Sequence, residues 1–453
     1  MRRSILWFRR DLRLADLPAL HAAAADGEVV PVFVVDPLFT ARSGAPRLAF
    51  LAVTLDALDA DLGGSLVVRH DDPVDVIPAL AAEVGADAVH VSRDYGPYGR
   101  RRDAEVAARL QRDGRRLVGT GTPYAVAPGT VVKGDGGPYA VFTPFARAWR
   151  AAGWDLPLDA PSDVAWVGAP AVASDGIPAG PTVDTALPPA GEAVAHEQWA
   201  TFLAAGDEGL DGYDARRDLP GVAGTSRLSP MLRWGVVHPR QLLADLGPTR
   251  AHDVFRSELA WREFYADVLL RHPDSGWRNL QQKMDAMPVD TDARARERFA
   301  AWQAGRTGYP IVDAGMRQLL ATGWMHNRVR MIVGSFLVKD LHLPWQWGAR
   351  HFMDHLVDGD LASNSHGWQW VAGTGTDAAP YFRVFNPTAQ SERSDPDGAY
   401  LRRWLPELAD LDDRSIHQPG TRRPADYPAP IVDHAAERDE ALHRYRSVTG
   451  ASR

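Results

Sequence analysis

The sequence predicts an N-terminal α/β domain with a doubly wound parallel sheet, joined by a long linker to an all-α C-terminal domain. Three patterns predict it: β-branched apolar runs that alternate with helical segments, a stretch at 153–189 rich in proline, alanine and glycine, and helical periodicity alone after that stretch. The 453 residues suffice for about two or three domains. We place the α/β domain at 1–128, the linker at 129–195 and the helical domain at 196–453.

Five short apolar runs predict the strands of the first domain. They are rich in β-branched residues and lack the alternation of a half-exposed sheet, which favours strands covered on both faces. The predicted strands are 5–8, 29–35, 66–69, 88–91 and 116–118, with helices such as 48–61 and 73–84 between them. Sheets of this kind bind ligands at the carboxyl ends of their strands.

The second half of the chain has helical patterns only. We expect helices near 196–205, 229–246, 252–271, 292–304, 311–323, 325–341 and 345–357. The stretch before them has no periodic pattern, and a loop of this length usually wraps over other structure or has a function.

Composition excludes several classes of protein. The sequence contains no cysteine, which excludes disulfides, thiolate nucleophiles and cysteine-ligated zinc. No window is apolar enough to span a bilayer, and the first apolar run is too short for a signal peptide, so we expect a cytoplasmic protein with no membrane partner. The net charge of −8 argues weakly against a nucleic-acid partner, but binding depends on local patches rather than on net charge.

The stretch 358–370 (DGDLASNSHGWQW) is the most informative part of the chain. It holds two carboxylates, an amide and two indoles. Carboxylates and asparagine can hydrogen-bond the polar edge of a heterocycle, while indoles can stack on a flat ring or supply it with an electron. The segment therefore indicates a pocket for a large planar redox cofactor.

A second mixed segment lies at 258–265 (ELAWREFY). Glu258, Trp261, Arg262 and Tyr265 fall on one face of a predicted helix. An acid, a base and two aromatic rings on one face fit a binding site. Taken alone, they fit a surface ion pair beside ordinary core aromatics better.

Two further segments have both a functional and a purely structural interpretation. In 324–331 (WMHNRVRM), Asn327, Arg330 and Met331 share a helical face and Arg328 points elsewhere, which suits either a buried site with an outer phosphate contact or a basic solvated helix. In 224–230 (GTSRLSP), small hydroxyl residues precede a proline, which is the pattern of a helix N-cap. Free N–H groups at a helix start also bind pyrophosphate well.

Taken together, these segments resemble the DNA photolyase/cryptochrome family of flavoproteins, in particular its class I-like cyclobutane pyrimidine dimer photolyases. Two more segments carry the resemblance: 7–14 (WFRRDLRL), which is similar to the family's opening strand and loop, and 307–314 (TGYPIVDA). The resemblance spans nearly the whole chain, so a chance match of the ordered set is negligible.

The resemblance implies FAD, held in a U shape within the helical domain. Arg330 and Asp358 look like the family's buried ion pair against the isoalloxazine ring, and Asn364 would lie at flavin N5. The FAD-binding residues that it implies are Tyr213, Thr225, Ser226, Leu228, Ser229, Glu258, Arg262, Asn327, Arg330, Asp358, Asp360 and Asn364.

The resemblance also implies light-driven repair of DNA containing cyclobutane pyrimidine dimers, in which photoexcited reduced FAD passes an electron to a flipped-out lesion. Photolyases as a family are known to act on bases that have left the DNA stack. The catalytic residues would be Glu258, Trp261, Asn327, Met331 and Trp370. Contacts with DNA phosphates would come from Arg217, Arg328 and Arg383. This chemistry needs no metal, and we expect a monomer with no obligate protein partner.

Other branches of the family remain as alternatives. Members that repair (6-4) photoproducts carry a histidine pair, and this chain has the sequence MHNR from Met325 at that place. A cryptochrome-like blue-light photoreceptor that signals through a partner is the main alternative. The lesion-facing residues favour the enzyme, and 432–453 form a short helical end rather than a long signalling tail.

The chain departs from the family in its tryptophans. Trp368 and Trp345 match the inner and middle members of the family's electron-transfer chain from flavin to surface. The outer member would fall at Asp292, which is not a tryptophan, so the series of electron-transfer tryptophans is truncated. We therefore expect slow or rerouted photoreduction of oxidised FAD, with Trp302 or Tyr381 as substitutes.

The resemblance also bears on an antenna pigment. Segment 93–100 (RDYGPYGR) is similar to the loop of members that bind 8-hydroxy-5-deazaflavin. Asp94 would contact that chromophore, and Arg233 would stand where those members have a lysine, which keeps the charge but not the geometry. Folate-binding members have an Asn-Glu pair where this chain has Tyr98 and Gly99. We expect 8-hydroxy-5-deazaflavin first, no antenna second and methenyltetrahydrofolate third.

Overall fold

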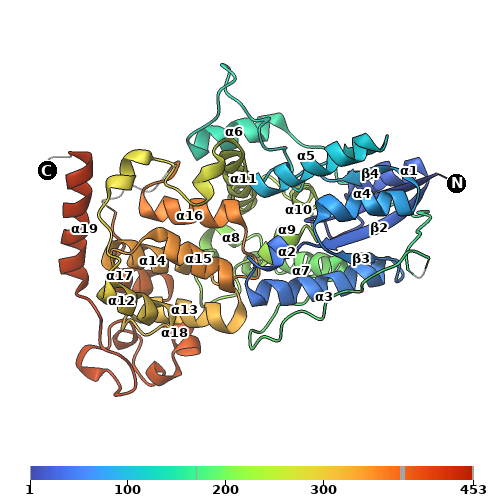
Figure 1. Cartoon of the computed structure of the whole chain (residues 1–453). Helices are drawn as coiled ribbons and strands as arrows, with labels where there is room; N and C mark the ends of the chain where they lie inside the picture. Colours follow the sequence, from blue (N-terminus) through green and yellow to red (C-terminus); the bar gives the residue numbers. More distant parts are fainter. Residues whose placement is uncertain (1, 170, 378–382, 451–453) are drawn as a thin grey trace. The chain divides into compact units, whose positions relative to one another are not determined.

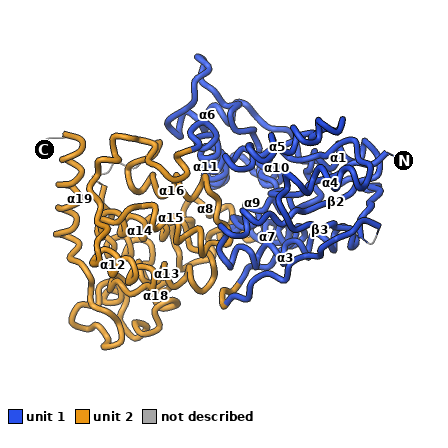
Figure 2. Tube along the Cα trace, viewed as in Figure 1, with its two compact units in different colours: residues 1–183, 187–204, 226–273 blue, residues 184–186, 205–225, 274–453 orange. Residues whose placement is uncertain are grey.

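The computed structural model describes residues 2–169, 171–377 and 383–450 (Figure 1). The chain forms two compact units, and each unit is discontinuous in sequence (Figure 2). Unit 1 comprises 1–183, 187–204 and 226–273, and unit 2 comprises 184–186, 205–225 and 274–453. The predicted domains are continuous stretches of chain and the units are not, so the two divisions do not correspond. The predicted boundaries at 128 and 195 therefore stay predictions.

Unit 1 is built around a five-stranded parallel sheet in the order β3-β2-β1-β4-β5. The strands are β1 (Arg3–Phe8), β2 (Glu28–Val35), β3 (Val67–His70), β4 (Ala86–Val91) and β5 (Arg116–Gly119). Ile5 in the central strand pairs with Val30 on one side and Val89 on the other. The three inner strands are buried along most of their length, which explains their apolar, non-alternating sequences. The predicted doubly wound sheet is confirmed.

Helices follow and cover these strands, and several begin at a proline, whose fixed φ suits the first helical turn. The helices of unit 1 are α1 (Pro18–Asp26), α2 (Pro37–Thr40), α3 (Ala45–Asp61), α4 (Pro73–Glu83), α5 (Pro97–Arg112), α6 (Phe142–Ala152), α7 (Glu192–Ala204), α9 (Ser229–Trp234), α10 (Pro239–Ala244) and α11 (Arg250–Arg271).

Two local expectations in unit 1 are corrected. Helix α6 lies inside the predicted linker, because Phe145 and Trp149 form a short apolar stripe that is buried, with Phe145 against Phe264 of α11. The single helix expected at 229–246 is two helices, α9 and α10. The break is at Gly235, whose φ of 67° and close approach to another backbone segment both exclude a side chain.

Unit 2 is helical, as predicted, and no strand occurs among the residues of it that the structure describes. Its helices are α8 (Tyr213–Arg216), α12 (Ala293–Gln303), α13 (Pro310–Thr322), α14 (Asn327–Ser335), α15 (Trp345–His355), α16 (Leu361–Ala372), α17 (Pro387–Ser394), α18 (Ala399–Trp404) and α19 (His434–Thr449). The helix expected at 325–341 ends as one π-helical turn, Phe336–Asp340. The core of unit 2 includes Trp302, Met316 and Phe336, all fully buried.

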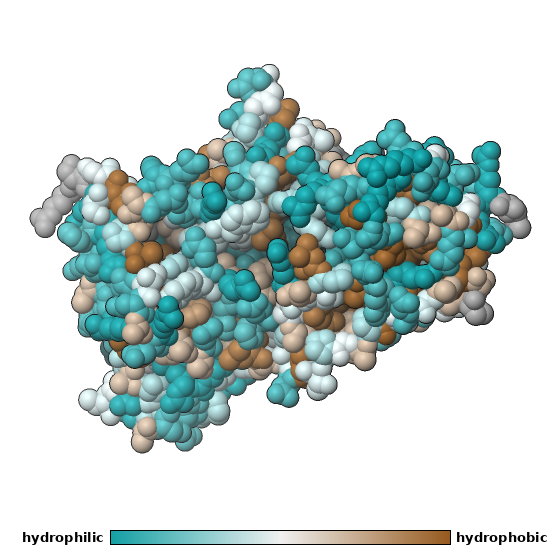
Figure 3. All heavy atoms as spheres, viewed as in Figure 1, coloured by the Kyte–Doolittle hydropathy of each residue, from teal (hydrophilic) through white to brown (hydrophobic). Residues whose placement is uncertain are grey.

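The surface facing the viewer in Figure 3 is mainly hydrophilic, with separate apolar patches. None of the helices in the described ranges is long and apolar enough to cross a membrane.

Candidate functional site

The first cluster of predicted site residues lies in unit 2, between α14 and the turn that joins α15 to α16. Arg330 Nη2 donates to Asp358 Oδ2 at 2.8 Å, and Arg330 Nε donates to the carbonyl of Met325 at 2.7 Å. The side chain of Asp358 is 3% exposed and that of Arg330 is 25% exposed. The two residues therefore form the expected ion pair, while their contact with a flavin stays a prediction.

Two predicted site residues of unit 2 each have a buried polar atom with no hydrogen-bond partner among the residues that the structure describes, namely Asp358 at Oδ1 and Trp368 at Nε1. Leaving a buried donor or acceptor unsatisfied costs about 1–3 kcal/mol, so a water molecule or a bound group that pairs with such atoms stabilises the site. A flavin ring carries hydrogen-bond donors and acceptors along one edge. A carboxylate oxygen and an indole N–H fit it, so the residues present suit FAD.

Two other predicted flavin residues, at the start of α16 and one turn into it, have hydrogen-bond partners within unit 2. Asp360 caps the helix by accepting the amide N–H of Ser363 at 3.0 Å. The Asn364 amide donates to the carbonyl of Ala349 at 2.9 Å and so ties α16 to α15. These two bonds fix the Asp360 side chain at the start of α16 and the Asn364 side chain against α15.

Two predicted phosphate ligands in unit 2 share one partner. Arg328 Nη2 donates to Asp218 Oδ2 at 2.5 Å, and Arg217 Nε lies 3.9 Å from Asp218 Oδ1. The Arg217 guanidinium also lies over the Tyr213 ring, 5.7 Å from its centroid. Sequence reasoning missed Asp218, because an aspartate in an irregular segment has no pattern that marks it.

The residues expected to face the lesion differ in exposure. Asn327, the first residue of α14, is exposed, and Met331 and Trp370 are partly exposed. Arg383 is exposed. Tyr381, the possible substitute in electron transfer, lies outside the described residues.

The second cluster lies on α11 in unit 1. Trp261 stacks on Phe142 of α6, with ring centroids 3.7 Å apart and planes at 9°. Arg262 donates to the carbonyls of Pro123 and Leu232 at 3.0 and 3.1 Å. Trp261 thus takes part in aromatic packing between two helices, which agrees with the alternative that the aromatic residues of 258–265 are ordinary packing residues. Its role at a lesion remains a prediction.

Other predicted residues of unit 1 lie around this helix and at the start of α9. Glu258 on α11 is partly exposed. Leu228, whose side chain makes no cap hydrogen bond, occupies the N-cap position of α9, so the interpretation of a hydroxyl residue as the N-cap is wrong. Ser229 is the first helical residue, and the Ser226 carbonyl accepts a bond from Gln198 at 2.6 Å. Thr225 belongs to unit 2, so the predicted FAD residues are divided between the units.

Glu263 was missed by the sequence analysis. It is 2% exposed and accepts hydrogen bonds from the amides of Ala125 and Val126 at 2.5 and 3.0 Å and from Trp149 Nε1 at 2.5 Å. Burial raises the pKa of Glu263 to about 7, although these donors lower it. Asp267, one turn later, accepts the amide of Gly129 at 2.7 Å. Two acids one turn apart on a buried face were the available signal.

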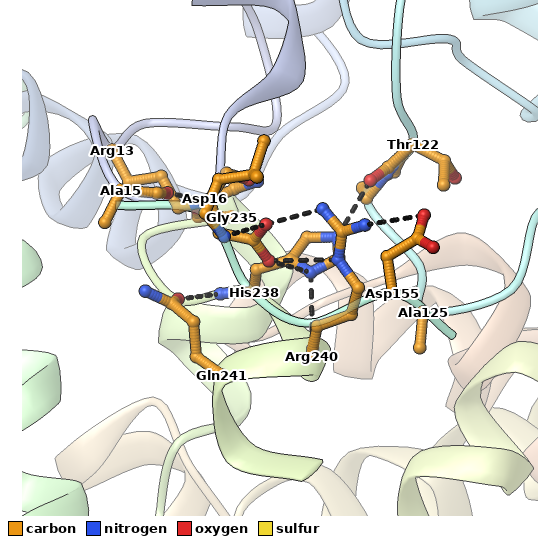
Figure 4. A network of polar contacts seen from close by, with 12 residues as sticks. Arg13, Ala15, Asp16, Thr122, Ala125, Asp155, Gly235, His238, Arg240 and Gln241 are labelled. Atoms are coloured by element: carbon orange, nitrogen blue, oxygen red, sulfur yellow. Dashed lines mark hydrogen bonds and ion pairs between the residues drawn. The ribbon is translucent and has the colours of Figure 1, made fainter. Parts of the chain in front are cut away.

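A buried network fixes the loop that follows β1 (Figure 4). Asp16 Oδ2 lies 2.8 Å from His238 Nδ1, and Arg240 Nη2 donates to Asp16 Oδ1 at 2.5 Å. His238 Nε2 lies 2.9 Å from the carbonyl oxygen of Thr122. Burial raises the pKa of Asp16, but its bonds to His238 and Arg240 outweigh burial and lower it to about 2.

An open pocket of about 350 Å³ lies at the carboxyl ends of β4 and β5, where ligands of such sheets bind. Asp94, Tyr95 and Arg100 are among its lining residues. Asp94 accepts the amide N–H of Gly96 at 3.0 Å. Burial alone would raise the pKa of Asp94, but the neighbouring arginines outweigh burial and lower it. Arg233 is not among the lining residues, and its guanidinium instead packs over the Trp234 ring. Of the two predicted antenna residues, only Asp94 faces this pocket.

The two predicted electron-transfer tryptophans lie in different surroundings. Trp368 packs against α15 at Gly348, where a Cβ atom would lie 2.6 Å from Trp368 Cζ2, and its ring meets that of Trp302. Trp345 is buried, and its indole N–H donates to Asn279 Oδ1 at 2.8 Å.

Comparison with known proteins gives one consistent result. Residues 4–162 match the DNA photolyase family, and 255–447 match the family described as the FAD binding domain of DNA photolyase. The deoxyribodipyrimidine photo-lyase of Streptomyces griseus is 42% identical, with 99% of each chain covered.

Solved structures agree with this result. A bacterial class III photolyase from Agrobacterium tumefaciens has a TM-score of 0.91 at 37% identity, covering 100% of this chain and 98% of that one. A cryptochrome from Synechocystis has a TM-score of 0.89 at 28% identity, covering 98% and 99%. With sequence, fold and relatives in agreement over its whole length, the chain belongs to the DNA photolyase family and carries that family's FAD-binding domain.

Proposed function

We propose that the chain is a deoxyribodipyrimidine photo-lyase, which uses light to split the bonds that join the two pyrimidines of a dimer in DNA. One observation carries the proposal: the Arg330–Asp358 pair lies within the segment that matches the FAD-binding domain, and one buried oxygen of its carboxylate has no partner in the described part of the chain. The relatives that match along the whole chain bear the name of this activity.

FAD, when bound, supplies the electron that light drives into the lesion. We assign Asp358 Oδ1 to a donor on the polar edge of the flavin, with Arg330 balancing the carboxylate charge. Asp360 and Asn364 would border the same ring, and their bonds within α16 and to α15 support precise placement. Arg262 lies in unit 1, where two backbone carbonyls hold its guanidinium, and stays a predicted FAD-binding residue. Tyr213, with the segment 225–229, would hold the phosphates.

We assign the lesion to Glu258, Trp261, Asn327, Met331 and Trp370. Partial exposure of Glu258, Met331 and Trp370 supports this assignment, because a base extruded from DNA can reach only side chains open to solvent. Glu258 would hydrogen-bond a pyrimidine edge and stabilise charge that develops there during electron transfer. The indoles would pack on the flat faces of the bases.

The DNA backbone would be bound by Arg217 and Arg328, with Arg383 as a further contact. Asp218 pairs with Arg217 and Arg328 and so holds both guanidinium groups in one place. The two arginines form a local positively charged cluster within a chain of net charge −8. Loss of either arginine should weaken binding to all sequences similarly and reduce its dependence on salt concentration.

We infer that the pocket at the ends of β4 and β5 takes the antenna, with 8-hydroxy-5-deazaflavin as first candidate. A volume of about 350 Å³ suits a ring system of that size, and Tyr95, Arg100 and Asp94 offer stacking, charge and a hydrogen-bond acceptor. An absorption spectrum of the purified protein distinguishes deazaflavin, methenyltetrahydrofolate and flavin alone by their separate bands.

Light-dependent repair of a thymine-dimer oligonucleotide tests the proposed function. The chain loaded with FAD should restore the pyrimidines in light and not in the dark, and FAD binding without repair would reject the enzyme in favour of a photoreceptor. Glu258→Ala should lower the repair yield and keep FAD bound. Glu297→Ala, which removes an exposed carboxylate on α12, is the matched control. Equal yields from both variants would remove Glu258 from the mechanism.

A further inference from the structure

We propose that Trp302 and Trp347, bridged by Phe299, carry electrons between the surface of unit 2 and Trp368. This relay would replace the missing outer tryptophan, and it rests on the proposed function because a bound flavin accepts the electron. It assigns a role in photoreduction to Trp347, which no sequence motif indicated.

The relay is a continuous series of ring contacts. The centroids of Trp368 and Trp302 are 6.2 Å apart with planes at 66°, and those of Trp302 and Phe299 are 5.7 Å apart with planes at 15°. Phe299 meets Trp347 at 5.3 Å. Phe299 and Trp302 are three residues apart on α12, so one face of that helix presents both rings to α15.

The two ends of the relay suit their tasks. Trp302 is 0% exposed and cannot exchange electrons with dissolved molecules, whereas Trp347 is partly exposed. Among the described residues, the rings that meet Trp368 at such short separations are those of Trp302 and Phe352, and not that of Trp345. Since electron tunnelling slows exponentially with the gap between rings, this ring contact makes Trp302 a suitable first donor to Trp368.

The surroundings of Trp302 allow it to lose an electron and keep its proton. Its indole N–H donates to the carbonyl of Val333 at 3.1 Å, and a backbone carbonyl is too weak a base to remove that proton. The ring of His351 lies 5.5 Å from that of Trp302. Burial, with a smaller effect of His355, lowers the pKa of His351 to about 3. His351 is therefore neutral near pH 7 and adds no positive charge that would oppose oxidation of Trp302.

The electrons and protons balance as follows. Trp368 gives one electron to the photoexcited oxidised flavin, which is reduced, and takes one from Trp302. Trp302 takes one from Trp347 across Phe299. Oxidised Trp347 releases its indole proton to water. A dissolved thiolate then returns an electron to it and becomes a thiyl radical, and the indole nitrogen takes a proton back from water.

The decisive variant is Trp347→Phe, which removes the outer end and leaves the buried core in place. Trp277→Phe is the control, since Trp277 is also in unit 2 and is 49% exposed. In the FAD-loaded parent and the control, transient absorption should detect a long-lived tryptophan radical, and thiol-dependent photoreduction should proceed. Trp347→Phe should lose the long-lived radical and most of the photoreduction. Unchanged photoreduction in Trp347→Phe overturns the relay.

Mass spectrometry gives a second readout. Illumination of the parent without thiol should leave oxidation products on Trp347, and products confined to Trp345 or Trp277 would overturn the proposal. Phe299→Leu should slow photoreduction while Trp347 remains. Repair with chemically reduced FAD should be equal in Trp347→Phe and the parent, because repair does not need the relay. Failure of the parent in that repair assay would reject the proposed function. The photoreduction rates and the oxidation products located by mass spectrometry would still test the relay.

Discussion

Replacing Glu263 by glutamine tests how α11 holds the segment 125–126. The carboxylate accepts three N–H groups: one oxygen takes Ala125, and the other takes Val126 and Trp149. An amide has a single acceptor oxygen, so in its better orientation it still leaves one buried donor facing an NH₂ group. The structural penalty is then about 1–3 kcal/mol in the free energy of unfolding.

The penalty should depend on pH, and the sign follows from the raised pKa of Glu263. The folded value is about 7 against an ordinary 4.5. Between these values the folded protein keeps a proton that the unfolded chain has lost, so the stability of the parent falls as pH rises through this window. The fall amounts to about 3 kcal/mol at most. Glutamine does not titrate, so the stability gap between parent and variant should be largest near pH 5 and shrink towards pH 8.

Urea unfolding at several pH values between 5 and 8 measures this gap, with circular dichroism as the signal. Because two compact units need not unfold together, midpoints of parent and variant are compared at each pH. Glu105→Gln, at an exposed carboxylate on α5, is the matched control and should show no gap. A gap for Glu263→Gln that stays constant or widens from pH 5 to 8 would refute the reasoning.

Three further changes have definite expected outcomes. Gly348→Ala places a Cβ atom 2.6 Å from Trp368 Cζ2, and overpacking of about 1–3 kcal/mol should exceed the helix-propensity gain of about 1 kcal/mol, so a raised melting temperature would contradict the packing. Arg330→Met leaves the Asp358 carboxylate buried without its cation and should cost about 3–5 kcal/mol in denaturant unfolding, with weaker FAD binding; a neutral effect would remove the pair from the site. Asp16→Asn should destabilise the protein by roughly 2 kcal/mol at pH 7, because a pKa of about 2 against 3.8 stabilises the fold above pH 4. That difference should vanish as pH falls to 2, and a difference that persists there would contradict the ion pair.

The sequence by itself determined the fold class and the family. Strand and helix patterns are local, because β-branched runs and helical periodicity depend on neighbouring residues, and all five predicted strands are present. The family motifs are likewise contiguous, so Arg330 and Asp358 could be named as a pair before any geometry was known. The local patterns failed at Gly235, where a tertiary contact with another backbone segment sets the break.

Only the tertiary structure decided which side chains from distant segments meet. Asp218 joins Arg217 to Arg328, and Glu263 gathers donors from two other segments, although neither acid belongs to a recognisable pattern. The path from Trp302 through Phe299 to Trp347 depends on how α12 and α15 pack. Helix periodicity fixes which residues share a face, but the partner of that face is chosen by packing across the whole core, which no local stretch of sequence encodes.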